Sequence, residues 1–144
     1  MKMLLINTDL GLAPYGDDAY EAKRKLKLGG VYTCEVKAMR NVKFLRKYMK
    51  LMHLAWEYLS EDVVKFFGGN ERTFRHTVEV AAGSFELCYD IKNKTWIQSH
   101  KSVSFNSMKQ DEFDTLYERV KDVLFSTFLR NIDINDFNNL LTQF

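Results

Sequence analysis

The chain has 144 residues with 46% apolar, 14% aromatic and 28% charged side chains, and its net charge is +2. These values predict one folded domain over residues 1–144 and exclude a wholly disordered chain, because enough apolar side chains are present for one core. No stretch approaches the about 18 apolar residues of a membrane span, and Met1–Ile6 is too short for a signal-peptide core. We therefore expect a cytoplasmic protein that does not associate with membranes.

The first forty residues predict a strand, a helix and a second strand. Lys2–Asn7 is a short apolar run typical of a strand, and a loop containing the only proline, Pro14, follows it. Asp17–Leu28 predicts a helix, since acidic residues open it and lysines lie toward its end, matching the helix dipole. Two glycines end this helix, and Val31–Lys37 is rich in residues that favour β-structure.

The middle of the chain predicts two helices and a hairpin. Apolar residues recur at helical spacing over Asn41–Ser60, and a second helix is expected over Asn70–Ala82 with Gly83 as its stop. Phe85–Ile91 and Thr95–Phe105 predict the two strands of a hairpin. The intervening residues, Lys-Asn-Lys, supply a turn.

Two further helices are expected at the end of the chain. Ser107 and Gln110 fit a capping box, which predicts a long helix from Gln110 to Arg130. Asp133 is a candidate cap for a last helix that ends near Phe144. The order of elements predicts an α+β fold with a small, mostly antiparallel sheet packed against several helices. Seven apolar residues on helical faces are expected in the core: Phe44, Leu51, Ala55, Phe113, Leu116, Val120 and Val123.

Charge is unevenly distributed along the chain. Residues 1–60 carry 11 basic and 6 acidic side chains, whereas residues 111–144 carry 3 and 7. Four basic residues share one side of the predicted Asn41–Ser60 helix, and Arg40 precedes it; this candidate nucleic-acid site comprises Arg40, Lys43, Arg46, Lys47 and Lys50. Cations on one rigid face suit successive phosphates. The alternative is that these basic residues only form the solvent-exposed side of a helix whose other side is buried. Glu57 lies on the same side and reduces its positive charge.

Other candidate sites are weaker. Glu35-Val36-Lys37 on a predicted strand matches half of a restriction-type nuclease motif, with Asp9, Asp17 or Asp18 as the further acid. The tripeptide is common, so we interpret its two charged residues as exposed neighbours of an inward Val36. The three histidines are scattered and predict no metal or cofactor site. Cys34 and Cys88 are expected to be small buried hydrophobes.

Three segments taken together resemble a known family. They are Lys37–Lys47 continuing to Tyr58, then Phe74–Gly83, then Lys101–Met108 with the helix that follows. In this order they are similar to conserved proteins of tailed phages and prophages that form a domain of unknown function. The stretch between Glu61 and Arg72 is shorter than in many members, and His53 stands where Asn or Gln is expected. The resemblance implies a bacterial host cytoplasm and no particular activity.

A second resemblance points to a function. A strand followed by Arg40-Asn41 and a helix with Arg46-Lys47-Tyr48 is similar to the start of NinB, the Orf recombination mediator of lambda-like phages. The similarity covers Gly30–Gly83, and it implies binding of single-stranded DNA as a dimer.

These observations leave three hypotheses for the function. The first is a non-catalytic phage accessory protein that binds single-stranded DNA in recombination or replication. The second is a phage protein that binds and inhibits a host protein, since its small size and aromatic residues fit that equally well. A metal-dependent nuclease is a distant third. The acidic C-terminal segment is complementary in charge to the basic region of another subunit, so we expect an oligomer, with a homodimer as the candidate.

Overall fold

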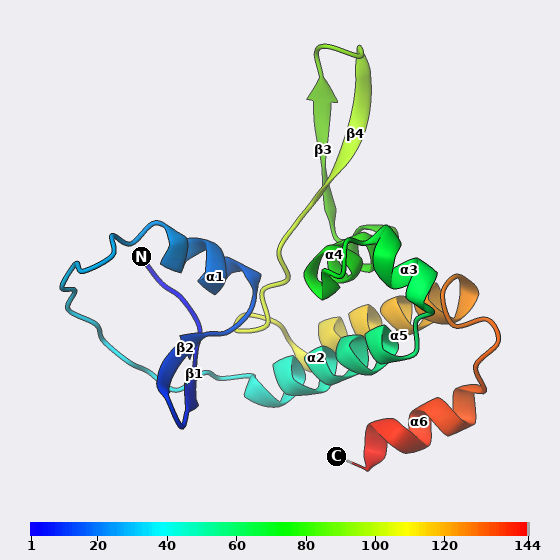
Figure 1. The fold of residues 1–144 in the computed structure, drawn as a ribbon, viewed down its shortest axis with the longest axis horizontal. Coiled ribbons are helices and arrows are strands. Elements are labelled where there is room, and N and C mark those ends of the chain that lie inside the picture. Colours follow the sequence, from blue (N-terminus) through cyan, green and yellow to red (C-terminus); the bar gives the residue numbers. More distant parts are fainter. Residues whose placement is uncertain (144) are drawn as a thin grey trace. The chain divides into compact units, whose positions relative to one another are not determined.

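The computed structural model describes residues 1–143 and confirms the α+β class (Figure 1). In this part of the chain the structure has six helices and four strands. The strands form two separate antiparallel sheets of two strands each, where the sequence predicts one small sheet. The chain falls into two compact units, Met1–Arg40 and a larger unit that begins at Asn41, and each is described here by itself.

The first unit contains a hairpin and one helix. β1 (Leu5–Thr8) pairs with β2 (Gly11–Pro14), and the Thr8 hydroxyl donates a hydrogen bond of 2.7 Å to the Gly11 carbonyl. Helix α1 (Asp17–Arg24) follows, with acidic residues in its first turn and basic residues in its last turn. The helix ends four residues earlier than predicted.

The strand predicted over Val31–Lys37 is not formed. A strand is stable only when its backbone groups find a neighbouring strand, and in the described residues no segment pairs with this one. Val31 and Val36 are exposed, and so is Cys34, which contradicts the prediction that this cysteine is buried. The residues of this segment favour β-structure, but they form no strand because no neighbouring strand pairs with them in the described part of the chain.

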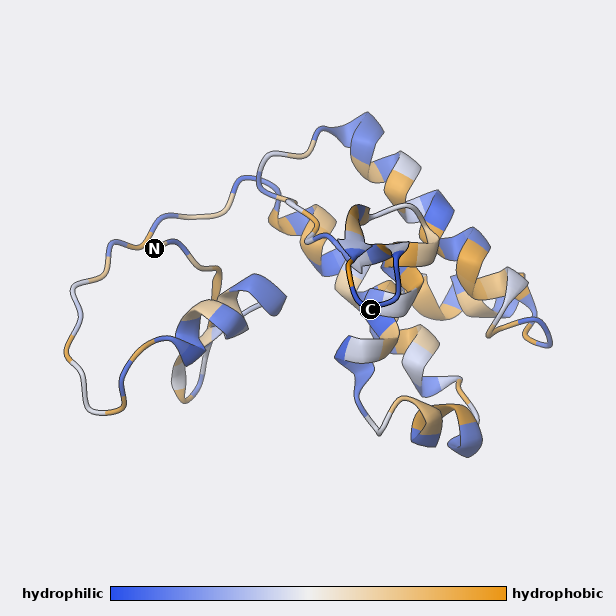
Figure 2. Ribbon diagram, turned by 90° about the horizontal axis from the view of Figure 1, so that it is seen from above, coloured by the Kyte–Doolittle hydropathy of each residue, from blue (hydrophilic) through white to orange (hydrophobic). Residues whose placement is uncertain are grey.

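Five helices build the larger unit, and the apolar faces of four of them form its core. They are α2 (Val42–Glu57), α3 (Glu61–Phe66), α4 (Glu71–Ala81), α5 (Gln110–Ser126) and α6 (Ile134–Thr142). Helix α2 packs against α4, α5 and α6. Apolar and polar stretches alternate along the helices in Figure 2, as expected for helices with one buried face. The largest fully buried side chains are Tyr48, Phe74, Phe113, Phe137, Leu51, Met52, Leu124, Leu129, Val78 and Val120.

Four of the seven predicted core residues are fully buried: Leu51, Ala55, Phe113 and Val120. Phe44, Leu116 and Val123 are partly exposed, so the structure places them at the margin of the core. Leu116 and Val123 lie at the edge of the apolar arc of α5, where the periodicity of the sequence does not distinguish a boundary from a centre, whereas Phe44 lies in the first turn of α2. Phe44 nevertheless stacks on Phe113, with ring centroids 4.6 Å apart.

The helix ends show which capping predictions hold. Asp133 caps α6, since its side chain accepts hydrogen bonds from the backbone N–H groups of Asn135 and Asp136. Gly83, with φ of 101°, follows the end of α4 as expected. The predicted capping box of Ser107 and Gln110 is wrong, because α5 begins at Gln110 itself. Its first turn is closed instead by Glu112, whose carboxylate accepts from the Lys109 backbone N–H at 3.2 Å.

Strands β3 (Phe85–Asp90) and β4 (Thr95–His100) form the predicted hairpin, which projects away from the helices (Figure 1). The second strand is shorter than predicted and ends at His100 rather than Phe105. The Asp90 carboxylate closes the turn by accepting from the backbone N–H groups of Lys92 and Asn93. Cys88 on β3 is exposed, contrary to the prediction.

Candidate nucleic-acid interface

Four of the five predicted site residues lie on one side of α2, and we call Lys43, Arg46, Lys47 and Lys50 the basic face. Lys43, Arg46 and Lys47 are exposed and Lys50 is half-buried. The opposite side of the helix is buried against the rest of the unit. The amphipathic pattern of α2 therefore places the four cations together. Arg40, the fifth predicted residue, is exposed and lies at the end of the first unit.

Lys47 differs from the other members of the basic face in its surroundings. Its ammonium Nζ lies 4.6 Å from the ring centroid of Tyr117 and 5.8 Å from that of Phe113, both on α5. Lys121 Nζ lies 5.8 Å from the same Tyr117 ring and also donates to Asn138 at 3.0 Å. The basic surface therefore continues from α2 to Lys121 on α5, a residue that the sequence did not single out.

Tyr117 itself is buried beneath these cations. Burial raises the pKa of its hydroxyl above the usual value, and the nearby charge of Glu118 raises the pKa further. The ring therefore stays neutral and presents its π-face to the two ammonium groups. This arrangement orders the long lysine side chains against α5.

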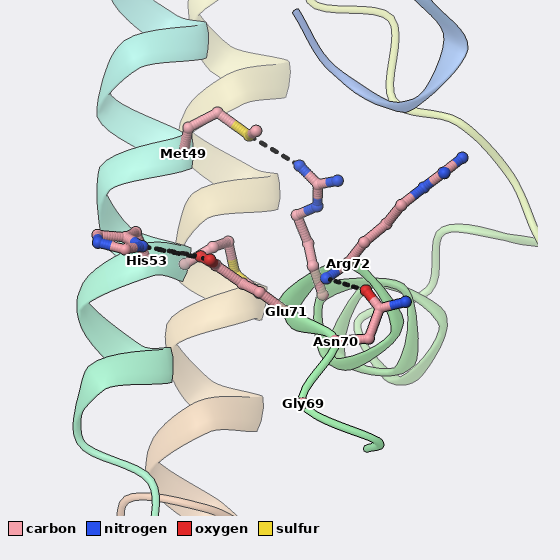
Figure 3. Close-up of a pocket in the computed structure, with 8 residues that line it drawn as sticks. Met49, His53, Gly69, Asn70, Glu71 and Arg72 are labelled. Carbon is pink, nitrogen blue, oxygen red and sulfur yellow. Dashed lines mark hydrogen bonds and ion pairs between the residues drawn. The ribbon is translucent and has the colours of Figure 1, made fainter. Parts of the chain in front are cut away.

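A pocket of about 660 Å³ opens between α2 and the start of α4 (Figure 3). Met49 and His53 line it from α2, while Asn70, Glu71 and Arg72 line it from the start of α4. Arg75 lies deeper, is nearly buried, and donates from Nη1 to the Met49 sulfur at 3.0 Å. Since Met49 lies one helical turn after Arg46, the pocket adjoins the basic face and brings two arginines of α4 close to it.

His53 sits between two glutamates at the rim of this pocket. Its Nε2 lies 3.1 Å from Glu57 on the same helix, and its Nδ1 lies 3.1 Å from Glu71. Glu57 lies one helical turn from His53 on α2, whereas Glu71 comes from another element, α4. Glu57, the acidic residue on the basic side of α2, is therefore engaged at the far end of the helix from Lys43.

A second polar cluster lies inside the unit, where α2, α4 and β4 meet. The carboxylate of Glu79, 4% exposed, accepts from the Tyr48 hydroxyl at 2.7 Å and lies 2.5 Å from Nε2 of His100. The rings of His76 and His100 stack with centroids 3.8 Å apart. The cluster holds the base of the hairpin to the helices. Its only signal in the sequence was an acidic residue on the apolar side of a predicted helix.

The residues of the nuclease hypothesis do not assemble into a site. Lys37 Nζ lies 3.3 Å from Glu35, both side chains are about four-fifths exposed, and neither residue lies on a strand. Over residues 1–143 no group of three histidine, cysteine or acidic side chains is arranged to hold a metal ion. Within the same range no helix combines the length and apolar character needed to cross a membrane.

Comparison with known proteins gives one result. A family model described as a protein of unknown function (DUF1367) matches residues 65–140, which is more than half of the chain. The match covers α4, the hairpin and α5, and it includes Glu79 and His100 but not Tyr48 or the basic face of α2. No curated protein and no solved structure matches the chain.

Proposed function

The chain belongs to the DUF1367 family, and we propose that it is a non-catalytic protein that binds single-stranded DNA through the basic face of α2. The observation that carries the proposal is the exposure of Lys43, Arg46 and Lys47 on one side of a rigid helix. A row of this kind suits the phosphates of a flexible strand, because each contact releases a counterion.

The surroundings of the basic face support the same proposal. Lys121 extends it across α5, and Arg72 of α4 lines the pocket at its other edge. Glu57 lies at the far end of α2, and its carboxylate is engaged by His53. A single strand crossing α2 would therefore meet cations from three helices. The resemblance of the sequence to phage proteins and to NinB supports a role in phage recombination or replication.

Salt dependence tests the proposal directly. Fluorescence anisotropy with a labelled single strand should show a log affinity that falls linearly with log salt, by about 0.7 for each phosphate contacted. Replacing both Lys43 and Arg46 with Ala should make the slope shallower by about 1.4. Both side chains are exposed and alanine favours helix, so the fold should be kept.

A matched control removes two charges elsewhere. Lys65→Ala with Lys92→Ala takes away two exposed cations outside α2 and should leave the slope unchanged. The same slope in the α2 variant and in the wild type would refute the assignment of the basic face. No binding at 50 mM salt would refute the proposed function as a whole.

The second candidate function, binding of a host protein, is favoured by one observation. The β3–β4 hairpin exposes Leu87, Tyr89, Trp96 and Ile97 to solvent, and apolar surface of this kind is typical of protein interfaces. Under this alternative the hairpin, and not the basic face, carries the activity. Loss of a captured host protein with Trp96→Ala, but not with the Lys43 and Arg46 variant, would favour it.

Nuclease activity is not part of the proposal. Incubation with DNA and Mg²⁺ or Mn²⁺ should leave the substrate intact, since Glu35 and Lys37 are exposed and, over residues 1–143, no group of three acidic, histidine or cysteine side chains is arranged to hold a metal ion. Cleavage by the wild type that is lost in Glu35→Gln would contradict this expectation.

A further inference from the structure

The β3–β4 hairpin has no structural partner along most of its length in the part of the chain described. It extends away from the helices in Figure 1, and apart from Asp90 the residues from Glu86 to Ser99 are exposed. Trp96 on β4 is 65% exposed and Ile97 is 44% exposed. Because an isolated hairpin of two strands is marginally stable in water, this one would gain from further pairing.

The two outer edges of the hairpin differ in their chemistry. β3 carries two acidic residues, Glu86 and Asp90, and charged side chains of this kind discourage the addition of another strand. β4 has no charged residue and no proline from Thr95 to Ser99. The edge of β4 is therefore the one that lacks protection against pairing.

The register of the hairpin shows which backbone groups this edge offers. The Lys101 N–H donates to the Ser84 carbonyl at 3.2 Å, so these residues form a hydrogen-bonded pair just below the ladder. Hydrogen-bonded and non-hydrogen-bonded pairs alternate along antiparallel strands. Glu86↔Ser99 and Cys88↔Ile97 are therefore hydrogen-bonded pairs, whose backbone groups point toward the other strand of the hairpin. The residues of β4 that alternate with Ser99 and Ile97 point their backbone N–H and C=O groups outward, to the free edge. These residues are Trp96, Gln98 and His100.

We propose that β4 pairs with β4 of a second copy of this chain, antiparallel and about a two-fold axis at Gln98. Three outward residues with Gln98 at their centre form a self-complementary set, as a two-fold interface requires. Gln98 then faces the partner's Gln98, and Trp96 faces the partner's His100. The two hairpins become one sheet of four strands, the size at which a sheet is stable.

Charge and anchoring favour a second copy as the occupant. In this register no like charges are opposite each other within Thr95–Ser99, and the central pair joins two neutral amides. Trp96, Leu87 and Tyr89 lie on the same face of the hairpin as Gln98, so pairing brings the apolar side chains of two copies together. The bond of His100 to Glu79 fixes the base of β4, so the edge is presented on a rigid support. The inference does not depend on DNA binding.

The two-fold register makes a charge-swap experiment possible. Gln98→Lys and Gln98→Glu each place like charges opposite each other, and each should raise the dimer dissociation constant by about fivefold. An equimolar mixture of the two variants pairs opposite charges and should dimerise at least as tightly as the wild type. Sedimentation velocity over a concentration series measures this, with a chain mass of 16.9 kDa for the monomer.

Leu87 provides the matched control. It lies opposite Gln98 on the same face of the hairpin, but its own edge is that of β3. Leu87→Lys and Leu87→Glu should show no recovery on mixing; recovery there and not at Gln98 would assign the contact to β3 and overturn the proposal. Circular dichroism and urea midpoints verify that all four variants fold.

A wild-type chain that stays monomeric over the whole concentration series would also overturn the proposal. If the Trp96 fluorescence of such a monomer is quenched by a single-stranded oligonucleotide, the hairpin binds nucleic acid bases instead. A dimer that none of the Gln98 variants affects would place the subunit contact elsewhere on the chain.

Discussion

Glu79 on α4 and His100 at the end of β4 approach within 2.5 Å, and this contact joins the hairpin to the helical core. The second carboxylate oxygen of Glu79 accepts from the Tyr48 hydroxyl of α2 at 2.7 Å. One nearly buried carboxylate therefore connects three elements that are far apart in the sequence. A buried polar group is stabilising only while its partners are present, which makes this cluster sensitive to substitution.

Glu79→Leu should lower the free energy of unfolding by about 1–3 kcal/mol, because Tyr48 and His100 lose their shared partner. Urea denaturation followed by circular dichroism measures the change. His53→Ala is the matched control: it removes an exposed histidine that also contacts two glutamates, and exposed ion pairs contribute only about 0–1 kcal/mol. Equal midpoints for the two variants would show that the Glu79 cluster does not contribute to stability.

One valine and one leucine on α5, Val120 and Leu116, test which residues of this helix belong to the core. Val120 is fully buried, so Val120→Ala should cost about 1–3 kcal/mol through lost contacts and an unfilled cavity. Leu116 is half-buried, so Leu116→Ala should cost less than the about 2–5 kcal/mol typical of a buried leucine, despite removing more atoms. A larger loss for Leu116→Ala than for Val120→Ala would reverse the assignment. Urea midpoints of both variants decide the matter.

The helices were the most predictable part of the fold. Helices α2, α4 and α5 each carry apolar residues at helical spacing over three or more turns, and the sequence located all three to within a few residues. Helix α3 was missed because six residues are too few to establish a period, although Ser60 caps it. The strand predicted over Val31–Lys37 failed for the opposite reason, because strand formation depends on a partner that local composition does not report.

The candidate site was predictable only where one helix contains it. Lys43, Arg46 and Lys47 share a side of α2 by helical geometry alone. The contact of Lys47 with Tyr117 and the pocket lined by Arg75 involve residues from different helices. Their proximity depends on how α2, α4 and α5 pack, which no local pattern in a single sequence specifies. The Glu79 cluster escaped prediction for the same reason.

Tyr117 gives a prediction for alkaline pH. Burial raises the pKa of its hydroxyl in the folded state, so the folded chain holds this proton more tightly than the unfolded chain. The resulting stability is complete below the unfolded pKa of about 10 and is lost as pH rises through the folded value. The wild type should therefore lose stability between pH 9 and 11 more steeply than Tyr117→Phe. If the urea midpoints of the wild type and of Tyr117→Phe fall by the same amount over this pH range, the prediction is contradicted.

Lys43 and Lys47 should separate DNA binding from stability. Both are exposed members of the basic face, so each change to Ala should weaken binding of single-stranded DNA and reduce the salt slope by about 0.7 if each cation contacts one phosphate. Of these two lysines Lys47 alone lies over the Tyr117 ring, and a cation in that position contributes about 0.5–1 kcal/mol to folding. Lys47→Ala should therefore also lower the urea midpoint, whereas Lys43→Ala should leave it unchanged.

Lys47→Arg provides the control for this pair of variants. It keeps the positive charge over the ring and the charge available to phosphate, so both the urea midpoint and the salt slope should stay close to those of the wild type. Equal midpoints for Lys43→Ala and Lys47→Ala would show that the contact with Tyr117 adds nothing to stability. If the salt slope changes with Lys43→Ala but not with Lys47→Ala, the contact with the aromatic ring keeps the Lys47 ammonium from binding phosphates. The DNA would then cross α2 on the side of Lys43 and Arg46.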